Sequence, residues 1–285
     1  MDSPKPFLTV RIHDSGIIPT LCGLCAGYER GEWRDEQLAK HLVEWLPEFS
    51  LTASELKTLN SGNAVELLRR AAQVVYQSAK FKNRGEFGEL LLHAAVRQVH
   101  NSIPAISKIY YKTAVNETVK GFDAVHVVDS AGELELWLGE AKFYNDITRA
   151  IRDVVNELET HFKNDYLRNE FLLISGKIDD ASPHAPTLRR LVEPNTSLDE
   201  IFKRACIPVL LTYDSDCIGN NTTCDAKFVA AFEAELRTHY NAFVAKLADK
   251  PVPKEVRVHL FLVPLKSKAE LVAKLDAQLK IWQQI

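Results

Sequence analysis

The 285-residue sequence lacks the features of a membrane protein or an exported protein. It contains no uninterrupted apolar run of the ~18–20 residues that a membrane-spanning helix needs. Residues 1–6 are polar and no apolar stretch follows them, so we expect no secretory signal peptide. Basic residues are not in excess, because the net charge is −3, and no global positive field attracts nucleic acid. These absences predict a cytoplasmic protein with no membrane partner, which contacts nucleic acid only through a local basic patch or a second protein.

Cysteines are few, and their number, five, is odd. In a chain without an export signal this indicates reduced thiols. Cys22 and Cys25 have the spacing of a zinc or redox pair. Cys217 and Cys224 are separated by six residues, which suits a zinc ribbon poorly. We therefore favour the interpretation that the cysteines are small buried thiols.

The sequence also lacks internal repeats, low-complexity tracts and recognisable linkers. Its hydrophobic content of 46% and charged content of 26% are those of an ordinary globular protein. We expect one mixed α/β domain over residues 1–285, with a strand and helical N-terminal portion over 1–80, a central core over 84–263 and a C-terminal helix over 266–285.

Hydrophobic periodicity predicts the elements of this domain. Helices are expected over residues 33–46, 64–78, 86–100, 145–163, 227–247 and 268–285. Strands are expected over residues 7–18, 109–113, 122–128, 134–141, 171–174, 207–211 and 256–263. A capped helix start is expected near Thr52, and Pro104 is expected to lie beyond the end of the helix over 86–100.

The most informative segments are residues 121–125, Gly-Phe-Asp-Ala-Val, and residues 138–142, Leu-Gly-Glu-Ala-Lys. A hairpin centred on residues 131–132 places Asp123 opposite Glu140. Because side chains alternate along a strand, Glu140 and Lys142 then lie on the same face as the apolar residues of that strand. That face is expected to be buried, and burial of an unpaired charge is costly. A divalent cation held by the two carboxylates would offset that cost. The competing interpretation is a solvated strand end.

This order of helix, strand, strand with Glu-x-Lys and helix resembles the core of the PD-(D/E)xK nuclease superfamily. The resemblance implies a restriction-endonuclease-like fold, a central mixed sheet flanked by helices. It also implies that Asp123 and Glu140 are ligands of Mg²⁺ or Mn²⁺ and that Lys142 orients the attacking water or stabilises charge. The residues before Asp123 are Gly-Phe, whereas the superfamily name has proline.

The superfamily often adds an acidic ligand from the helix before the first core strand. Residues 84–89, Arg-Gly-Glu-Phe-Gly-Glu, supply two candidates. We prefer Glu89 as the third metal ligand, because the apolar residues that follow it at helical spacing would aim it inward. Glu86 is the alternative, or a favourable charge at a helix N-terminus.

A closer resemblance is to the HamA family, the nuclease subunits of Hachiman anti-phage systems. It rests on residues 84–89, 120–126 and 136–144. It implies a metal-dependent DNA nuclease, the effector of a bacterial defence complex, restrained and directed by a HamB-like superfamily 2 helicase. The absence of a Walker A motif agrees with a motor on another chain.

Other polar residues near this region have two interpretations. Arg149 and Arg152 lie near the start of the helix after Lys142 and are candidates for contacts to DNA phosphates. A solvated helix face is the equal alternative. Tyr144 would either line the cleft or pack. By strand alternation His126 points away from Asp123, and His93 is expected to be structural.

Two other classes of function compete with this hypothesis. A non-catalytic subunit would keep the nuclease fold as a scaffold or DNA clamp, although the complete set of Asp123, Glu140 and Lys142 argues against it. A restriction or repair nuclease acting alone is disfavoured, because no specificity domain or basic stripe is recognisable.

Overall fold

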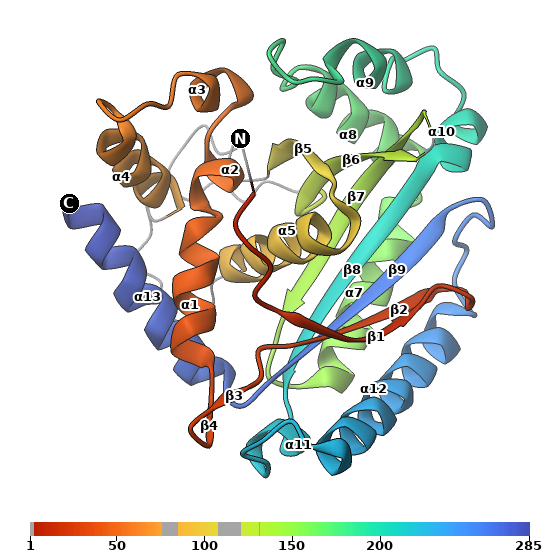
Figure 1. Cartoon of the computed structure of the whole chain (residues 1–285). Coiled ribbons are helices and arrows are strands. Elements are labelled where there is room, and N and C mark those ends of the chain that lie inside the picture. Colours follow the sequence, from red (N-terminus) through yellow and green to blue (C-terminus); the bar gives the residue numbers. More distant parts are fainter. Residues whose placement is uncertain (1–2, 76–84, 108–120, 131) are drawn as a thin grey trace.

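The computed structural model describes residues 3–75, 85–107, 121–130 and 132–285. A seven-stranded mixed sheet runs through its centre in the order β1-β2-β9-β8-β7-β6-β5 (Figure 1). Its strands are β1 (Thr9–Asp14), β2 (Thr20–Cys25), β5 (Ile103–Ser107), β6 (Ala124–Ser130), β7 (Glu133–Phe143), β8 (Ala205–Asp214) and β9 (Arg257–Leu265). A small separate hairpin pairs β3 (Tyr28–Glu29) with β4 (Glu32–Trp33).

The four middle strands of the sheet are parallel neighbours, and the pairs toward both edges are antiparallel. Nine of the ten residues of β8 are buried, and only Asp214 at its end is exposed. A strand covered on both faces needs such a continuous apolar run, so the predicted strand over 207–211 is confirmed. The mixed α/β class is confirmed as well, and β1 and β2 join the same sheet as β9.

The helices in the described ranges cover both faces of the sheet. They are α1 (Asp35–Glu44), α2 (Leu46–Ser50), α3 (Ala53–Lys57), α4 (Ala64–Val75), α5 (Glu86–His100), α7 (Ile147–His161), α8 (Asn164–Ser175), α9 (Ala185–Leu191), α10 (Leu198–Arg204), α11 (Asp216–Gly219), α12 (Ala226–Leu247) and α13 (Lys268–Gln284). None of these helices is both long enough and apolar enough to span a membrane.

Helices α5 and α7 lie on opposite faces of β7 (Figure 1). A Cβ added to Gly139 of β7 would lie 2.8 Å from Leu92 of α5, so Gly139 faces α5. Lys142, three residues further along the strand, forms an ion pair with Glu157 of α7. Because side chains alternate along a strand, Glu140 and Lys142 share the face that α7 covers.

The register of the central hairpin agrees with the prediction. Ala124 pairs with Gly139, and the pairing continues without a bulge to Ser130 and Glu133. At the turn, Gly132 has φ +87° and its amide donates to the Asp129 carboxylate. Extension of this register by one residue sets Asp123 opposite Glu140, as we expected from the spacing of the two segments.

The predicted strand over 171–174 is wrong. These residues belong to α8, in which Leu167, Phe171 and Ile174 are buried while Leu172 and Leu173 are 55% and 47% exposed. The buried residues recur at intervals of four and three, which is the helical period. Four consecutive apolar residues fit a buried strand and an amphipathic helix equally well, and the tertiary packing selects the helix.

Helix α5 ends at His100, before Pro104, as predicted. The strand that follows it was not predicted. Pro104 lies inside β5, which forms one edge of the described sheet, where a missing N–H is tolerated. The predicted strand over 109–113 lies outside the described residues, as do residues 76–78 of the predicted helix over 64–78. In place of the predicted strand over 7–18 the structure has the shorter strand β1, which β2 follows.

All five cysteines are free thiols. Cys22 and Cys25 lie in β2, where burial raises the pKa of Cys22 to about 12 and that of Cys25 to about 11. Such thiols are almost wholly protonated at neutral pH and are poor nucleophiles and metal ligands. The structure therefore supports the structural interpretation of this pair.

A buried polar network links α5 to β6. The imidazole nitrogens His93 Nδ1 and His126 Nε2 are 3.2 Å apart, and His126 Nδ1 is 2.8 Å from the hydroxyl of Ser102. Burial, together with the charge of Arg97, lowers the pKa of His126 to about 3, and burial also lowers the pKa of His93. Both imidazoles are therefore neutral in the folded protein at pH 7.

We expect this burial to make the protein sensitive to mild acid. Burial also lowers the pKa values of His100 and His259 to about 4. The unfolded chain protonates all four histidines below about pH 6.5, whereas the folded protein does not, so the free energy of unfolding falls as pH decreases from about 6.5 to about 4. Each excluded proton costs about 1.4 kcal/mol per pH unit.

Urea unfolding at pH 7.5, 6.5, 5.5 and 5.0 measures this loss. Burial raises the pKa values of Glu48 and Asp214, so these carboxyls take up protons more readily in the folded protein than in the unfolded chain. This works in the opposite direction and reduces the dependence of the unfolding free energy on pH by up to two protons. Stability that stays constant from pH 7.5 to 5.0 would contradict the prediction.

Candidate active site

Asp123 and Glu140 come together at the open end of the β6–β7 hairpin. The Asp123 amide donates to the Gly139 carbonyl at 2.8 Å, and the Ala141 amide donates to the Asp123 carboxylate at 2.9 Å. The Asp123 carboxylate is therefore held against the segment from Glu140 to Lys142. Both carboxylates are buried, with exposed fractions of 6% and 2%. The structure thus brings together these two residues as the sequence predicted.

Gly121, before this segment, lies against a residue that the sequence analysis did not identify. Gly121 has φ +150°, and a Cβ added to it would lie 2.4 Å from the carboxylate of Glu170. Glu170 is a buried residue of α8. The sequence analysis did not identify Glu170, because it predicted residues 171–174 as a strand. The helical periodicity of the apolar residues was the signal that could have assigned the segment to a helix. An acidic side chain therefore lies against the first residue of the Gly-Phe-Asp motif.

Lys142 is buried among acidic side chains. Burial opposes its charge, but the carboxylates of Glu140, Asp123 and Glu157 outweigh that effect and raise the Lys142 pKa above its usual value. Glu157, on α7, is the ion-pair partner, and the sequence analysis did not identify it. A lysine with a raised pKa stays protonated at neutral pH. It can stabilise charge and donate hydrogen bonds, but it cannot act as a general base there.

Helix α5 packs directly on the end of β7. A Cβ added to Gly88 would lie 2.7 Å from the Cβ of Phe143, so the helix and the strand are almost in backbone contact. Glu89, the next residue, is 6% exposed, whereas Glu86 is only partly buried. The burial agrees with our preference for Glu89. However, α5 lies on the face of β7 opposite to the one that Glu140 and Lys142 share.

Within the described ranges, no three His, Cys, Asp or Glu side chains are close enough together to form a preformed cation site. Mg²⁺ needs hard oxygen ligands and commonly takes only one or two carboxylates, with waters and substrate phosphate completing its shell. The pair Asp123 and Glu140 fits that requirement, and Mn²⁺ accepts the same ligands. Glu89 as a third ligand stays a prediction.

The predicted DNA contacts flank the end of β7. The guanidinium of Arg149 lies 5.0 Å from the centre of the Tyr144 ring. Arg149 and Arg152 both contact Asp153, at 3.5 Å and 2.9 Å, and their side chains are 64% and 55% exposed. Asp146 caps α7 by accepting from the Arg149 amide. Exposed cations beside a ring are compatible with phosphate contact and with a solvated helix face, so both interpretations stand.

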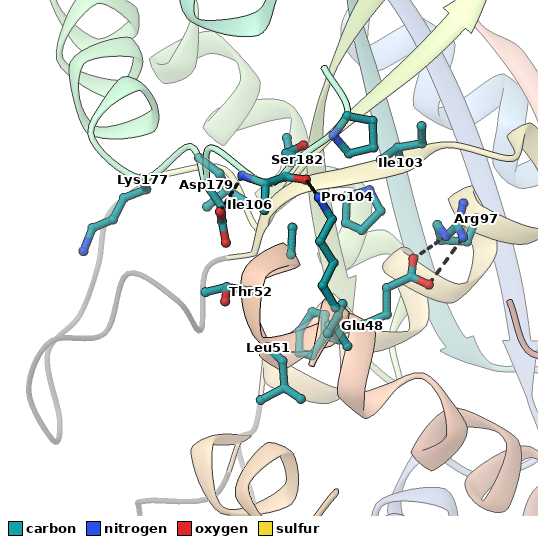
Figure 2. Close-up of a pocket in the computed structure, with 17 residues that line it drawn as sticks. Glu48, Leu51, Thr52, Arg97, Ile103, Pro104, Ile106, Lys177, Asp179 and Ser182 are labelled. Carbon is teal, nitrogen blue, oxygen red and sulfur yellow. Dashed lines mark hydrogen bonds and ion pairs between the residues drawn. The ribbon is translucent and has the colours of Figure 1, made fainter. Parts of the chain in front are cut away.

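A cavity of about 410 Å³ lies away from this site, at the edge of the sheet (Figure 2). It is lined by residues of α2, α3, α5, β5 and 177–183, and by none of the predicted site residues. Arg97 pairs with Glu48 at one end (Figure 2). At the other, Lys57 donates to the Ala181 carbonyl at 2.7 Å. Arg97, Glu48 and Lys57 thus have partners within the protein.

The amino-acid sequence of the chain matches a known protein family. The family model described as HamA matches residues 3–279. A curated relative, anti-bacteriophage protein A of Escherichia coli (strain K12), is 25% identical over 260 residues, which are 89% of this chain and 46% of that protein. The chain therefore spans less than half the length of that relative. Because the family match extends over nearly the whole sequence, the chain belongs to the HamA family.

Proposed function

We propose that this protein is a metal-dependent DNA nuclease that acts as the effector of anti-phage defence. The observation that carries the proposal is the hairpin end at which Asp123, Glu140 and Lys142 are buried together. Buried charges are costly unless a partner or a function requires them. Membership of the HamA family and the name of the E. coli relative support the defence context.

The residues present match the needs of phosphodiester hydrolysis. Asp123 and Glu140 would hold a divalent cation, which would supply a water of lowered pKa and positive charge against the scissile phosphate. Lys142, protonated and fixed by Glu157, adds a second positive charge where the phosphate accumulates negative charge. The hydrogen bond from the Ala141 amide orients the Asp123 carboxylate before any ligand binds.

Incubation of the purified chain with plasmid DNA and Mg²⁺, with and without chelator, tests the proposal. Cleavage that stops on chelation supports a metal-dependent nuclease. The competing proposal is a non-catalytic scaffold or DNA-clamp subunit, favoured by the lack of a preformed three-ligand cluster in the described ranges. DNA binding without cleavage, also in the presence of the partner below, would favour the scaffold.

We further propose that a HamB-like superfamily 2 helicase restrains and directs the nuclease. The support is membership of the HamA family, for which the sequence resemblance implies such a partner. Co-expression with the helicase, followed by size-exclusion chromatography and a cleavage assay, tests this. Separate elution at micromolar concentration would contradict a stable complex.

Lys142→Ala is expected to lose DNA cleavage and to keep metal binding. The substitution removes a charge that stabilises the transition state but no metal ligand, so we expect kcat to fall by roughly 10²–10³-fold. The Mn²⁺ dissociation constant, measured by calorimetry, should not rise, because the substitution removes no metal ligand and the lost cation repels the metal. Cleavage by folded Lys142→Ala at the wild-type rate would refute the catalytic role.

A further inference from the structure

The C-terminal helix α13 begins beside the candidate active site, although more than 120 residues separate the two in sequence. The ammonium of Lys268, the first residue of α13, lies 5.3 Å from the centre of the Phe143 ring and 5.8 Å from that of Tyr144. Arg149 of α7 lies 5.0 Å from the same Tyr144 ring. Two cations from distant segments therefore meet at one aromatic residue directly after β7.

This meeting point is adjacent to Lys142. Tyr144 is two residues beyond Lys142, about 6.6 Å along an extended chain. On α7, Arg149, Asp153 and Glu157 follow at intervals of four and so share one face of the helix. That face contacts Tyr144 through Arg149 and Lys142 through Glu157. Lys142 and Tyr144 thus both lie against the same face of α7.

The acidic groups beside these cations already have hydrogen-bond donors. Asp146 accepts from the Arg149 amide, and Asp214 accepts from the Lys268 amide at 2.6 Å. Asp153 accepts from Arg152 at 2.9 Å and is 3.5 Å from Arg149. Burial lowers the pKa of Lys268, Asp214 counteracts this, and the charge of Arg149 lowers the pKa further. Two like charges at one ring repel each other, and an anion placed between them relieves that repulsion.

We propose that Tyr144, Arg149 and Lys268 form a clamp for the DNA backbone, which holds the phosphate next to the one that is cut. The clamp rests on the proposed nuclease function and adds Lys268 to it. Its contacts are to phosphate, so they position the strand without reading sequence. The first turn of α13 therefore belongs to the DNA-binding surface, whereas we expected the whole C-terminal helix to lie outside the core.

The test is the affinity of full-length protein for a fluorescent DNA, single-stranded and duplex, at 50–200 mM salt without divalent metal. Removal of one phosphate contact lowers the slope of log K against log[salt] by about 0.9 for duplex and about 0.7 for a single strand. Lys268→Gln should therefore weaken duplex binding about eightfold near 0.1 M salt, equally for different sequences. Lys268→Arg should keep the wild-type affinity.

Lys266→Gln is the matched control, because it makes the same change in net charge two residues earlier. Lys266 pairs with Glu32 at 3.2 Å, and its substitution should leave the salt slope unchanged. In the cleavage assay Lys268→Gln should raise KM and largely keep kcat, since it removes binding common to substrate and transition state.

The outcomes separate the clamp from the nuclease proposal. A wild-type slope and affinity for folded Lys268→Gln would overturn the clamp, even if the protein cleaves DNA. A lowered slope in a protein that does not cleave DNA, also with the helicase partner present, would support phosphate binding at the clamp and refute the nuclease. Absence of DNA binding by the wild-type chain would overturn the clamp as well.

Discussion

Glu140→Gln and Asp123→Asn are expected to abolish Mg²⁺-dependent DNA cleavage and to leave the fold intact. Each substitution removes an anionic ligand from an ion that takes few protein ligands. Loss of the several kcal/mol that such an ion contributes corresponds to about 10³-fold or more in rate. Asn at position 123 can still accept the hydrogen bond from Ala141, so the hairpin end keeps its shape.

A plasmid-cleavage assay with thermal melts measures both parts of this prediction. Glu133→Gln is the control: it makes the same change on the same strand, in an exposed residue about 23 Å from Glu140. It should keep the wild-type rate. Melting temperatures of the two site variants should stay equal or rise, because one of several crowded carboxylates has been neutralised. Wild-type cleavage by either folded variant would refute the site.

The same assay ranks the two acidic residues of α5. If Glu89 contributes to the site, Glu89→Gln reduces cleavage more than Glu86→Gln, since Glu89 is buried and Glu86 is partly exposed. Equal activity of the two variants would remove Glu89 from the site and leave Asp123 and Glu140 as the protein ligands.

Gly88→Ala is expected to destabilise the protein by about 1–3 kcal/mol, because it forces a methyl group into a packed contact. The added Cβ would lie 2.7 Å from the Cβ of Phe143 and 3.5 Å from its backbone nitrogen. Backbone atoms of a central strand cannot yield as a side-chain tip can, so α5 must move away from β7. Because Glu89 and Phe143 both shift, cleavage should fall as well.

Gly176→Ala provides a matched control for this prediction. Gly176 caps α8 with φ −70°, and a Cβ there would meet its nearest atoms at an ordinary 3.7 Å. Alanine should be neutral at this position or stabilise the protein by up to about 1 kcal/mol through the unfolded chain. Urea unfolding decides the comparison. Equal stability of the two variants would show that the α5–β7 contact is looser than the structure indicates.

Local patterns in the sequence determined the hairpin and its register. The turn at residues 131–132 and the two-residue alternation were sufficient to set Asp123 opposite Glu140, and the structure has that register. The apolar run of β8 and the helical periods of α5 and α7 were equally clear. These are short-range effects, and neighbouring residues alone specify them.

The α8 segment shows where such patterns become ambiguous. Four consecutive apolar residues satisfy both a strand and a helix, and only the packing of Leu167, Phe171 and Ile174 against the core selects the helix. The position of Glu170 beside Gly121 depends on that choice. Sequence periodicity alone therefore did not identify the acidic residue that lies against Gly121.

The sequence by itself determined which charged residues lie at the end of the hairpin, because their spacing along two adjacent strands is a local property. Only the tertiary structure decided what those residues contact. The pairing of Lys142 with Glu157 depends on how α7 crosses the sheet, and the approach of Lys268 to Tyr144 depends on where α13 begins. Contacts between elements distant in sequence form because folding buries the apolar surface of the whole core. A local sequence pattern does not specify which distant elements come into contact.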